Sequence, residues 1–74
     1  MLINLRDKKN KLFIKDILDI EFDMRVEEKD NKYYVAVNKK YRYDMEFENE
    51  DDAEDQMILI ANARNNLENE LKNY

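Results

Sequence analysis

Seven amino-acid types are missing from the sequence: Gly, Pro, Ser, Thr, His, Cys and Trp. The absence of Ser, Thr and Cys excludes the usual catalytic nucleophiles. The absence of His excludes imidazole acid–base catalysis, and zinc sites built on His and Cys cannot form. Without Gly, no glycine loop can bind phosphate, and turns must use Asn, Asp or Lys. Since 74 residues also leave little room for a deep cleft, we expect no enzyme, no metal ion and no cofactor.

Long apolar runs are also missing, and no basic-then-apolar signal layout opens the chain. With no Cys, these features predict a cytoplasmic protein, in a bacterial or infected host cell, with no membrane contact. Hydrophobic residues make up 43% and charged residues 42% of the chain. Because the apolar residues are periodic, we predict one folded domain over residues 1–74 rather than disorder.

Alternation of apolar and polar residues predicts a series of antiparallel strands. The predicted strands cover about residues 1–5, 11–14, 17–27, 32–37 and 41–48. A four-residue loop in the first hairpin would place Leu5 opposite Leu12 and Ile3 opposite Ile14, all on one face. The alternation over 17–27 is the longest, and it predicts a strand with one buried face.

Two further loops set the pairing of the later strands. A four-residue loop at 28–31 would pair Val26 with Tyr33, and a three-residue loop at 38–40 would pair Val37 with Tyr41. On the outer face the second loop places Tyr34 opposite Asp44. These registers are self-consistent, because every apolar side chain then lies on the same face of the sheet.

A helical period begins after the last strand and predicts a helix over about residues 50–73. Asn49, Asp51 and Asp52 are all acceptable N-caps. The inward stripe comprises Ala53, Met57, Ile60, Arg64, Leu67 and Leu71. Ile58 lies about 160° from Ile60 and is expected to face solvent. The sequence therefore predicts an α+β fold: an antiparallel β-meander of four to five strands, including an N-terminal hairpin, with one C-terminal helix packed on one face.

Negative charge is concentrated in residues 44–55, which read DMEFENEDDAED and contain eight acids and no base. Residues 1–43 hold eleven Lys or Arg and eight Asp or Glu, whereas residues 44–74 hold two and ten. Such segregation favours an acidic surface that steers toward a basic partner. The predicted partner-binding residues, on the outward sheet face, are Asp19, Glu21, Asp23, Tyr34, Asp44, Glu46 and Glu48. The alternative is a solvated surface, with the acids of 50–55 complementing the helix dipole.

In its small size, its few strands with one helix and its DMEFENEDDAED stretch, the chain resembles the small acidic anti-defence proteins of phages, such as anti-CRISPR inhibitors. No motif matches residue by residue, so no functional positions carry over. The resemblance implies a stoichiometric inhibitor whose carboxylates mimic phosphates and occlude the nucleic-acid channel of a defence effector. The richness in Asn, Lys, Asp, Ile and Tyr fits an AT-rich genome, that of a low-GC bacterium or its phage.

Two other functions remain open. Exposed Ile58 and Leu59 could bury against a second copy of the chain and form a structural or regulatory homo-oligomer. A net charge of −5 and a pI near 4.7 disfavour direct nucleic-acid binding. A local basic patch on the first hairpin is the feature that would permit it, and it comprises Arg6, Lys8, Lys9, Lys11 and Lys15.

Overall fold

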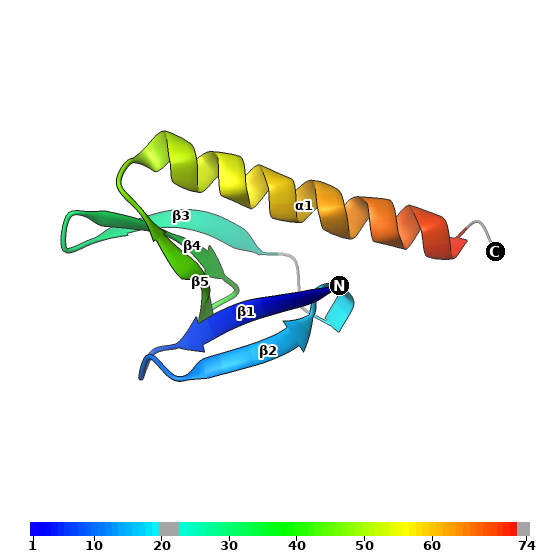
Figure 1. Cartoon of the computed structure of the whole chain (residues 1–74), viewed down its shortest axis with the longest axis horizontal. Helices are drawn as coiled ribbons and strands as arrows, with labels where there is room; N and C mark the ends of the chain where they lie inside the picture. Colours follow the sequence, from blue (N-terminus) through cyan, green and yellow to red (C-terminus); the bar gives the residue numbers. More distant parts are fainter. Residues whose placement is uncertain (20–22, 73–74) are drawn as a thin grey trace.

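A computed structural model describes residues 1–19 and 23–72 and shows one antiparallel sheet with a helix on one face (Figure 1). The elements are β1 (Leu2–Asp7), β2 (Leu12–Asp16), the 3₁₀ turn η1 (Ile17–Asp19), β3 (Met24–Lys29), β4 (Lys32–Val37), β5 (Tyr41–Phe47) and α1 (Glu50–Lys72). The five strands lie in the order β2-β1-β5-β4-β3. This arrangement confirms the predicted α+β fold.

Asn and Asp take the turn positions that Gly usually fills. Positive φ angles occur at Asn10 (64°), Asp30 (53°), Asn31 (63°) and Asn38 (47°), and each of these residues lies in a hairpin turn. Asn and Asp tolerate this left-handed region better than other residues that have a Cβ. The absence of Gly is therefore met by short polar side chains, and these residues set the loop lengths and the registers of the strands.

The first hairpin turns in three residues instead of the predicted four. The Asp7 amide donates to the Lys11 carbonyl oxygen at 3.1 Å, and the Asn10 amide donates to the Asp7 carbonyl oxygen at 3.0 Å. Asn10 takes the left-handed position that closes a three-residue loop. Leu5 consequently pairs with Phe13 rather than Leu12, so the predicted register was wrong by one residue.

A shift of one residue exchanges the two faces of β2. Phe13 moves to the core side, where its ring packs edge-on against Tyr41 with centroids 5.7 Å apart. Leu12 and Ile14, predicted to be inward, are 45% and 61% exposed. Leu12 and Ile14 therefore lie on the sheet face that the helix does not cover.

The strand predicted over 17–27 is also incorrect at its start. The Leu18 amide donates to Asp16 Oδ1 at 3.0 Å, and the Ile17 amide donates to the Met1 carbonyl oxygen at 2.9 Å. These bonds stabilise η1 and bury Ile17 to 1% exposure. Residues 20–22 of the predicted strand lie outside the described residues, and β3 begins at Met24.

Asp30 and Asn31 alone form the β3–β4 turn, because both adopt positive φ, as a two-residue type I′ turn requires. Val26 thus pairs with Val35 rather than Tyr33. This error of two residues leaves each side chain on its predicted face, since strand side chains alternate with a period of two.

The β4–β5 loop has the predicted three residues, and Val37 pairs with Tyr41. A register shift follows in β5, so that Tyr34 lies opposite Glu46 instead of the predicted Asp44. The shift is again an even number of residues, so Tyr34 and Glu46 stay on one face of the sheet.

Helix α1 begins at Glu50 and is capped by Asn49. Asn49 Oδ1 accepts from the Asp52 amide at 2.8 Å, and Asn49 Nδ2 donates back to Asp52 Oδ2 at 3.1 Å. The first of these bonds satisfies one of the backbone amides that the first helical turn leaves open. The predicted helix start is therefore confirmed, and Asn49 is the cap.

The inward face of α1 packs on the sheet through Ala53 and Ile60, which are 0% and 4% exposed. Leu71 was predicted to belong to this stripe but is 63% exposed. Leu71 belongs to the last turn of α1, and in Figure 1 the C-terminal end of the helix, drawn in red, extends past the strands. The core cluster consists of Ile3, Leu5, Ile17, Val35, Val37 and Ile60.

Candidate binding surfaces

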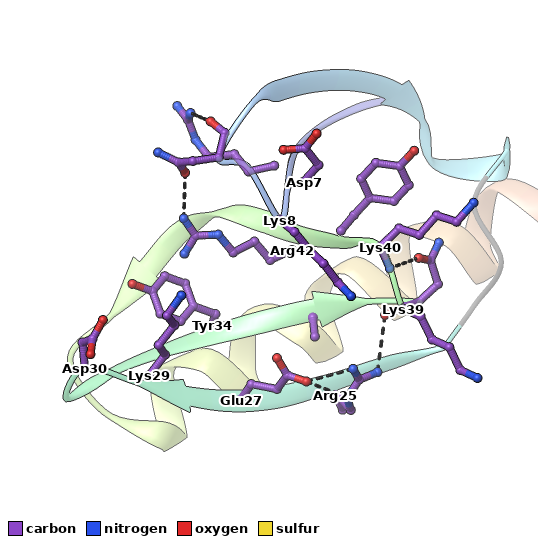
Figure 2. Close-up of a pocket in the computed structure, with 15 residues that line it drawn as sticks. Asp7, Lys8, Arg25, Glu27, Lys29, Asp30, Tyr34, Lys39, Lys40 and Arg42 are labelled. Atoms are coloured by element: carbon purple, nitrogen blue, oxygen red, sulfur yellow. Dashed lines mark hydrogen bonds and ion pairs between the residues drawn. The ribbon is translucent and has the colours of Figure 1, made fainter.

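A shallow hollow of about 750 Å³ lies on the sheet face opposite α1 (Figure 2). Val35 and Val37 belong to the core under the helix, so the alternate residues Tyr34 and Ala36 point the other way. Both of these line the hollow, together with side chains from β1, β3 and β5. The turns between β1 and β2 and between β4 and β5 lie at the same end of the sheet, because Asp7 pairs with Tyr41.

The hollow is basic. Its lining includes seven Lys or Arg but three Asp or Glu. The basic residues are Arg6, Lys8, Arg25, Lys29, Lys39, Lys40 and Arg42. The sequence predicted a face dominated by carboxylates, and the difference arises from the turns, whose lysines surround this face in the folded chain.

Arg42 and Tyr34 form the floor of the hollow. The Arg42 guanidinium lies 4.4 Å from the centre of the Tyr34 ring, and its Nη2 donates to Asn10 Oδ1 at 2.8 Å. The Tyr34 hydroxyl donates to Glu46 Oε2 at 3.1 Å. These contacts hold the Arg42 guanidinium over the Tyr34 ring within a basic surface.

The other two arginines are held by neighbouring groups. Arg6 pairs with Asp44, and its Nη1 donates to the Asn10 carbonyl oxygen at 2.8 Å. Arg25 Nη2 lies 2.8 Å from Glu27 Oε1. By contrast, four lysines of the lining form no ion pair among residues 1–19 and 23–72. They are Lys8, Lys29, Lys39 and Lys40.

The acids predicted to bind a partner from β5 are engaged within the chain. Asp44 pairs with Arg6, Glu46 accepts from Tyr34, and Glu48, just after the strand, pairs with Lys32. The hydrogen bond to Glu48 raises the pKa of Lys32 above its ordinary value of 10.5. These contacts within the chain would compete with contacts to a partner. A partner-binding role for these carboxylates stays a prediction.

The remaining predicted acids do not share the strand face expected for them. Asp19 lies in η1 and Asp23 precedes β3, and both are exposed. The Asp23 carbonyl oxygen accepts from the Asn38 amide at 2.7 Å. Glu21 lies outside the described residues. The continuous strand that would have aligned the three carboxylates is not formed over 17–19, because η1 replaces it.

A second surface lies on the outer side of α1. Asp51, Glu54 and Asp55 are exposed there, and none of them forms an ion pair within the described part of the chain. Ile58 and Leu59 follow at spacings of three and four residues and are 53% and 62% exposed. Residues at these spacings are neighbours on a helix. Leu59 lies at the flank of this surface, where it lines a small hollow with residues of β1. We call these five residues the acidic helix face.

Comparison with known proteins gives no match. No family model matches the sequence, and neither a curated protein nor a solved structure is significantly similar to it.

Two further features are absent from the part of the chain that the structure describes. No helix in that part of the chain is long and apolar enough to span a membrane. In the same ranges, no three carboxylates gather in a way that could hold a metal ion.

Sequence analysis missed the basic hollow, although part of its signal was present. Alternation does place Arg25 and Arg42 outward with Tyr34. Lysines also occur beside each of the three hairpin turns. What alternation could not show is the pairing of β1 with β5, which brings Arg6 and Lys8 beside Arg42.

Proposed function

We propose that this protein is a non-enzymatic binding protein that docks on a basic protein partner through the acidic helix face. The observation that supports it is the exposed apolar pair, Ile58 and Leu59, directly beside carboxylates that no Lys or Arg of the described chain neutralises. An apolar centre with a charged rim is the usual composition of a docking surface.

The carboxylates would act before and after contact. Asp51, Glu54 and Asp55 project from consecutive turns at the helix start, where the helix dipole also favours them. A charged rim steers a partner of opposite sign during encounter and fixes its orientation. Burial of Ile58 and Leu59 then supplies apolar area, at about 25 cal/mol per Å² removed from water.

A second copy of the chain is the other candidate to bind this face. The alternative function, a homo-oligomer formed through Ile58 and Leu59, depends on the same exposed residues. Two copies that met symmetrically through this face would bring their own carboxylates together. Like charges across an interface are unfavourable. Charge complementarity therefore favours a basic partner.

The class-level resemblance to phage anti-defence proteins suggests which basic partner to test first. A nuclease or other defence effector that holds nucleic acid in a basic channel presents the lysines and arginines that carboxylates can occupy. We propose an inhibitor of this kind, which would act by occlusion, as the biological form of the docking function.

The test uses purified nucleic-acid-binding defence effectors, freed of nucleic acid, and measures binding by interferometry at low and high salt. Asp55→Lys changes the acidic helix face, and Glu70→Lys makes the same charge reversal at the far end of the helix, where the residue is also exposed. We expect salt-sensitive binding that Asp55→Lys abolishes and Glu70→Lys preserves. Binding that ignores salt, or that both variants weaken equally, would overturn the proposal.

Light scattering decides the homo-oligomer alternative. If Ile58 and Leu59 join two copies, the wild type has a dimer mass and Ile58→Asp has a monomer mass. A monomer mass for both proteins rules that alternative out and leaves the helix face available for a different partner.

A further inference from the structure

We propose that the basic hollow on the sheet face binds single-stranded nucleic acid. This site is separate from the acidic helix face and does not rest on the function proposed for it. The two surfaces lie on opposite sides of the sheet, since the residues of the hollow alternate with core residues that contact the helix layer.

The charge of the hollow supports an anionic ligand. Lysines at its rim come from three hairpin turns and have no carboxylate partner among the described residues, so their charges are available. Lys8 comes from the first turn, Lys29 precedes the second, and Lys39 and Lys40 lie in the third. Lysines positioned in this way can contact phosphates without reading base sequence.

The net charge of the whole chain, −5, differs from the local charge around the hollow. Ten of the eighteen acids lie in residues 44–74, and those of the first helical turns lie on the opposite side of the sheet. Asp44 and Glu46 lie on the face of the hollow, where Arg6 pairs with Asp44 and the Tyr34 hydroxyl donates to Glu46. Exposed charges more than about 8 Å apart are largely screened at physiological salt. A phosphate chain in the hollow would therefore interact mainly with its own basic lining.

The floor of the hollow distinguishes a nucleic acid from an acidic peptide. Tyr34 and Arg42 present a ring and a guanidinium in cation–π contact, and the hydrogen bonds to Glu46 and Asn10 hold them in place. Unpaired bases stack on aromatic rings and on guanidinium planes. An acidic peptide has charge but no flat bases to stack, so it would use the lysines alone.

The size of the hollow favours a short single strand over a duplex. The surface runs along β4 between two of the lysine-bearing turns, and six strand residues span about 20 Å. That length suits about four nucleotides, the lower end of the sites on known single-strand-binding folds. Bases in a duplex are already stacked on one another and could not reach Tyr34.

The experiment measures fluorescence anisotropy of a labelled mixed-sequence 12-nucleotide DNA, and of its RNA counterpart, at about 20 mM salt. Lys8→Glu is compared with Lys9→Glu, which makes the same charge change in the same turn but lies outside the hollow. We expect Lys8→Glu to weaken binding about tenfold and to reduce the salt slope by about one, with Lys9→Glu close to wild type.

A second pair of variants tests the stacking floor. Tyr34→Phe removes the hydroxyl bond to Glu46 but keeps the ring, whereas Tyr34→Ala removes the ring. We expect a loss of about tenfold for Tyr34→Ala, in line with stacking contributions on single-strand proteins, and a clearly smaller loss for Tyr34→Phe, which keeps the ring but not the bond that orients it. Thermal melts of both variants confirm that the sheet is intact.

Four results would overturn the proposal. The first is no binding of either oligonucleotide at low salt. The second is an equal loss for Lys8→Glu and Lys9→Glu. The third is displacement by an equimolar 12-residue polyglutamate, which would make the hollow a site for acidic peptides. The fourth is tighter binding of a 12-base-pair duplex.

Discussion

Ile60 and Ile58 provide a stringent test of how α1 sits on the sheet. They are the same residue type, two positions apart on one helix, and are 4% and 53% exposed. Ile60 belongs to the core cluster with Val35 and Val37, whereas Ile58 lies on the outer side. Changing each to Ala alters helix propensity equally, so the difference between the two variants reports burial alone.

The expected magnitudes follow from the packing. Removing a buried Ile side chain costs about 2–5 kcal/mol, because the transfer free energy is lost and a cavity remains. A value near 3 kcal/mol for Ile60→Ala is a large part of the about 4–11 kcal/mol expected for a chain of this size. It would lower the melting temperature by about 12–24 °C. Ile58→Ala should cost less than about 1 kcal/mol, since half of its side chain already contacts water.

Circular dichroism melts, with urea unfolding of the same variants, measure both values. Similar losses for Ile58→Ala and Ile60→Ala would refute the assigned helix rotation. They would also remove Ile58 from the acidic helix face, so this measurement should precede the docking experiments.

Two further predictions concern a turn and an ion pair. Asn10→Ala and Asn10→Gly both remove the bond from Arg42, but Asn10→Ala should be less stable than Asn10→Gly by about 1 kcal/mol in urea unfolding, because a Cβ disfavours the left-handed region. Equal losses would show that the three-residue turn does not depend on that conformation. Hydrogen bonds to Glu48 and Glu28 raise the pKa values of Lys32 and Tyr33 above 10.5 and 10.0, so the folded state retains protons that the unfolded state releases. The free energy of unfolding should stay constant up to about pH 10 and decrease above it. For Glu48→Gln, the free energy of unfolding should decrease less steeply over the same pH range. Parallel curves would contradict the assignment to Lys32.

Local pattern was sufficient for the architecture. The alternation in 32–37 and 41–47, the change of period after Asn49 and the acids of the first helical turn each have a short-range cause. They correctly predicted two strands, the loop between them, the helix start and the exposure of Ile58. The absence of Gly likewise predicted that Asn, Asp or Lys would form the turns, and the four positive φ angles fall on Asn and Asp.

Turn conformation decided what pattern could not. The left-handed Asn10 shortened the first loop by one residue and moved Leu12 and Ile14 to the uncovered face. Alternation within β2 is the same in both registers, so the sequence alone could not distinguish them. Similarly, a hydrogen bond to Asp16 turns Ile17 into the core instead of continuing a strand.

Tertiary structure also decided the character of the surfaces. By itself, the sequence determined an acidic chain with eleven of its thirteen Lys and Arg in the first 43 residues. The pairing of β1 with β5, between segments far apart in the chain, gathers arginines and turn lysines around Tyr34. The same fold pairs Asp44 and Glu48 with basic side chains and leaves the acidic residues at the start of α1 exposed on the other side of the sheet. The sequence fixes the net charge of the protein, but the order of the strands determines which charged side chains lie together on one surface.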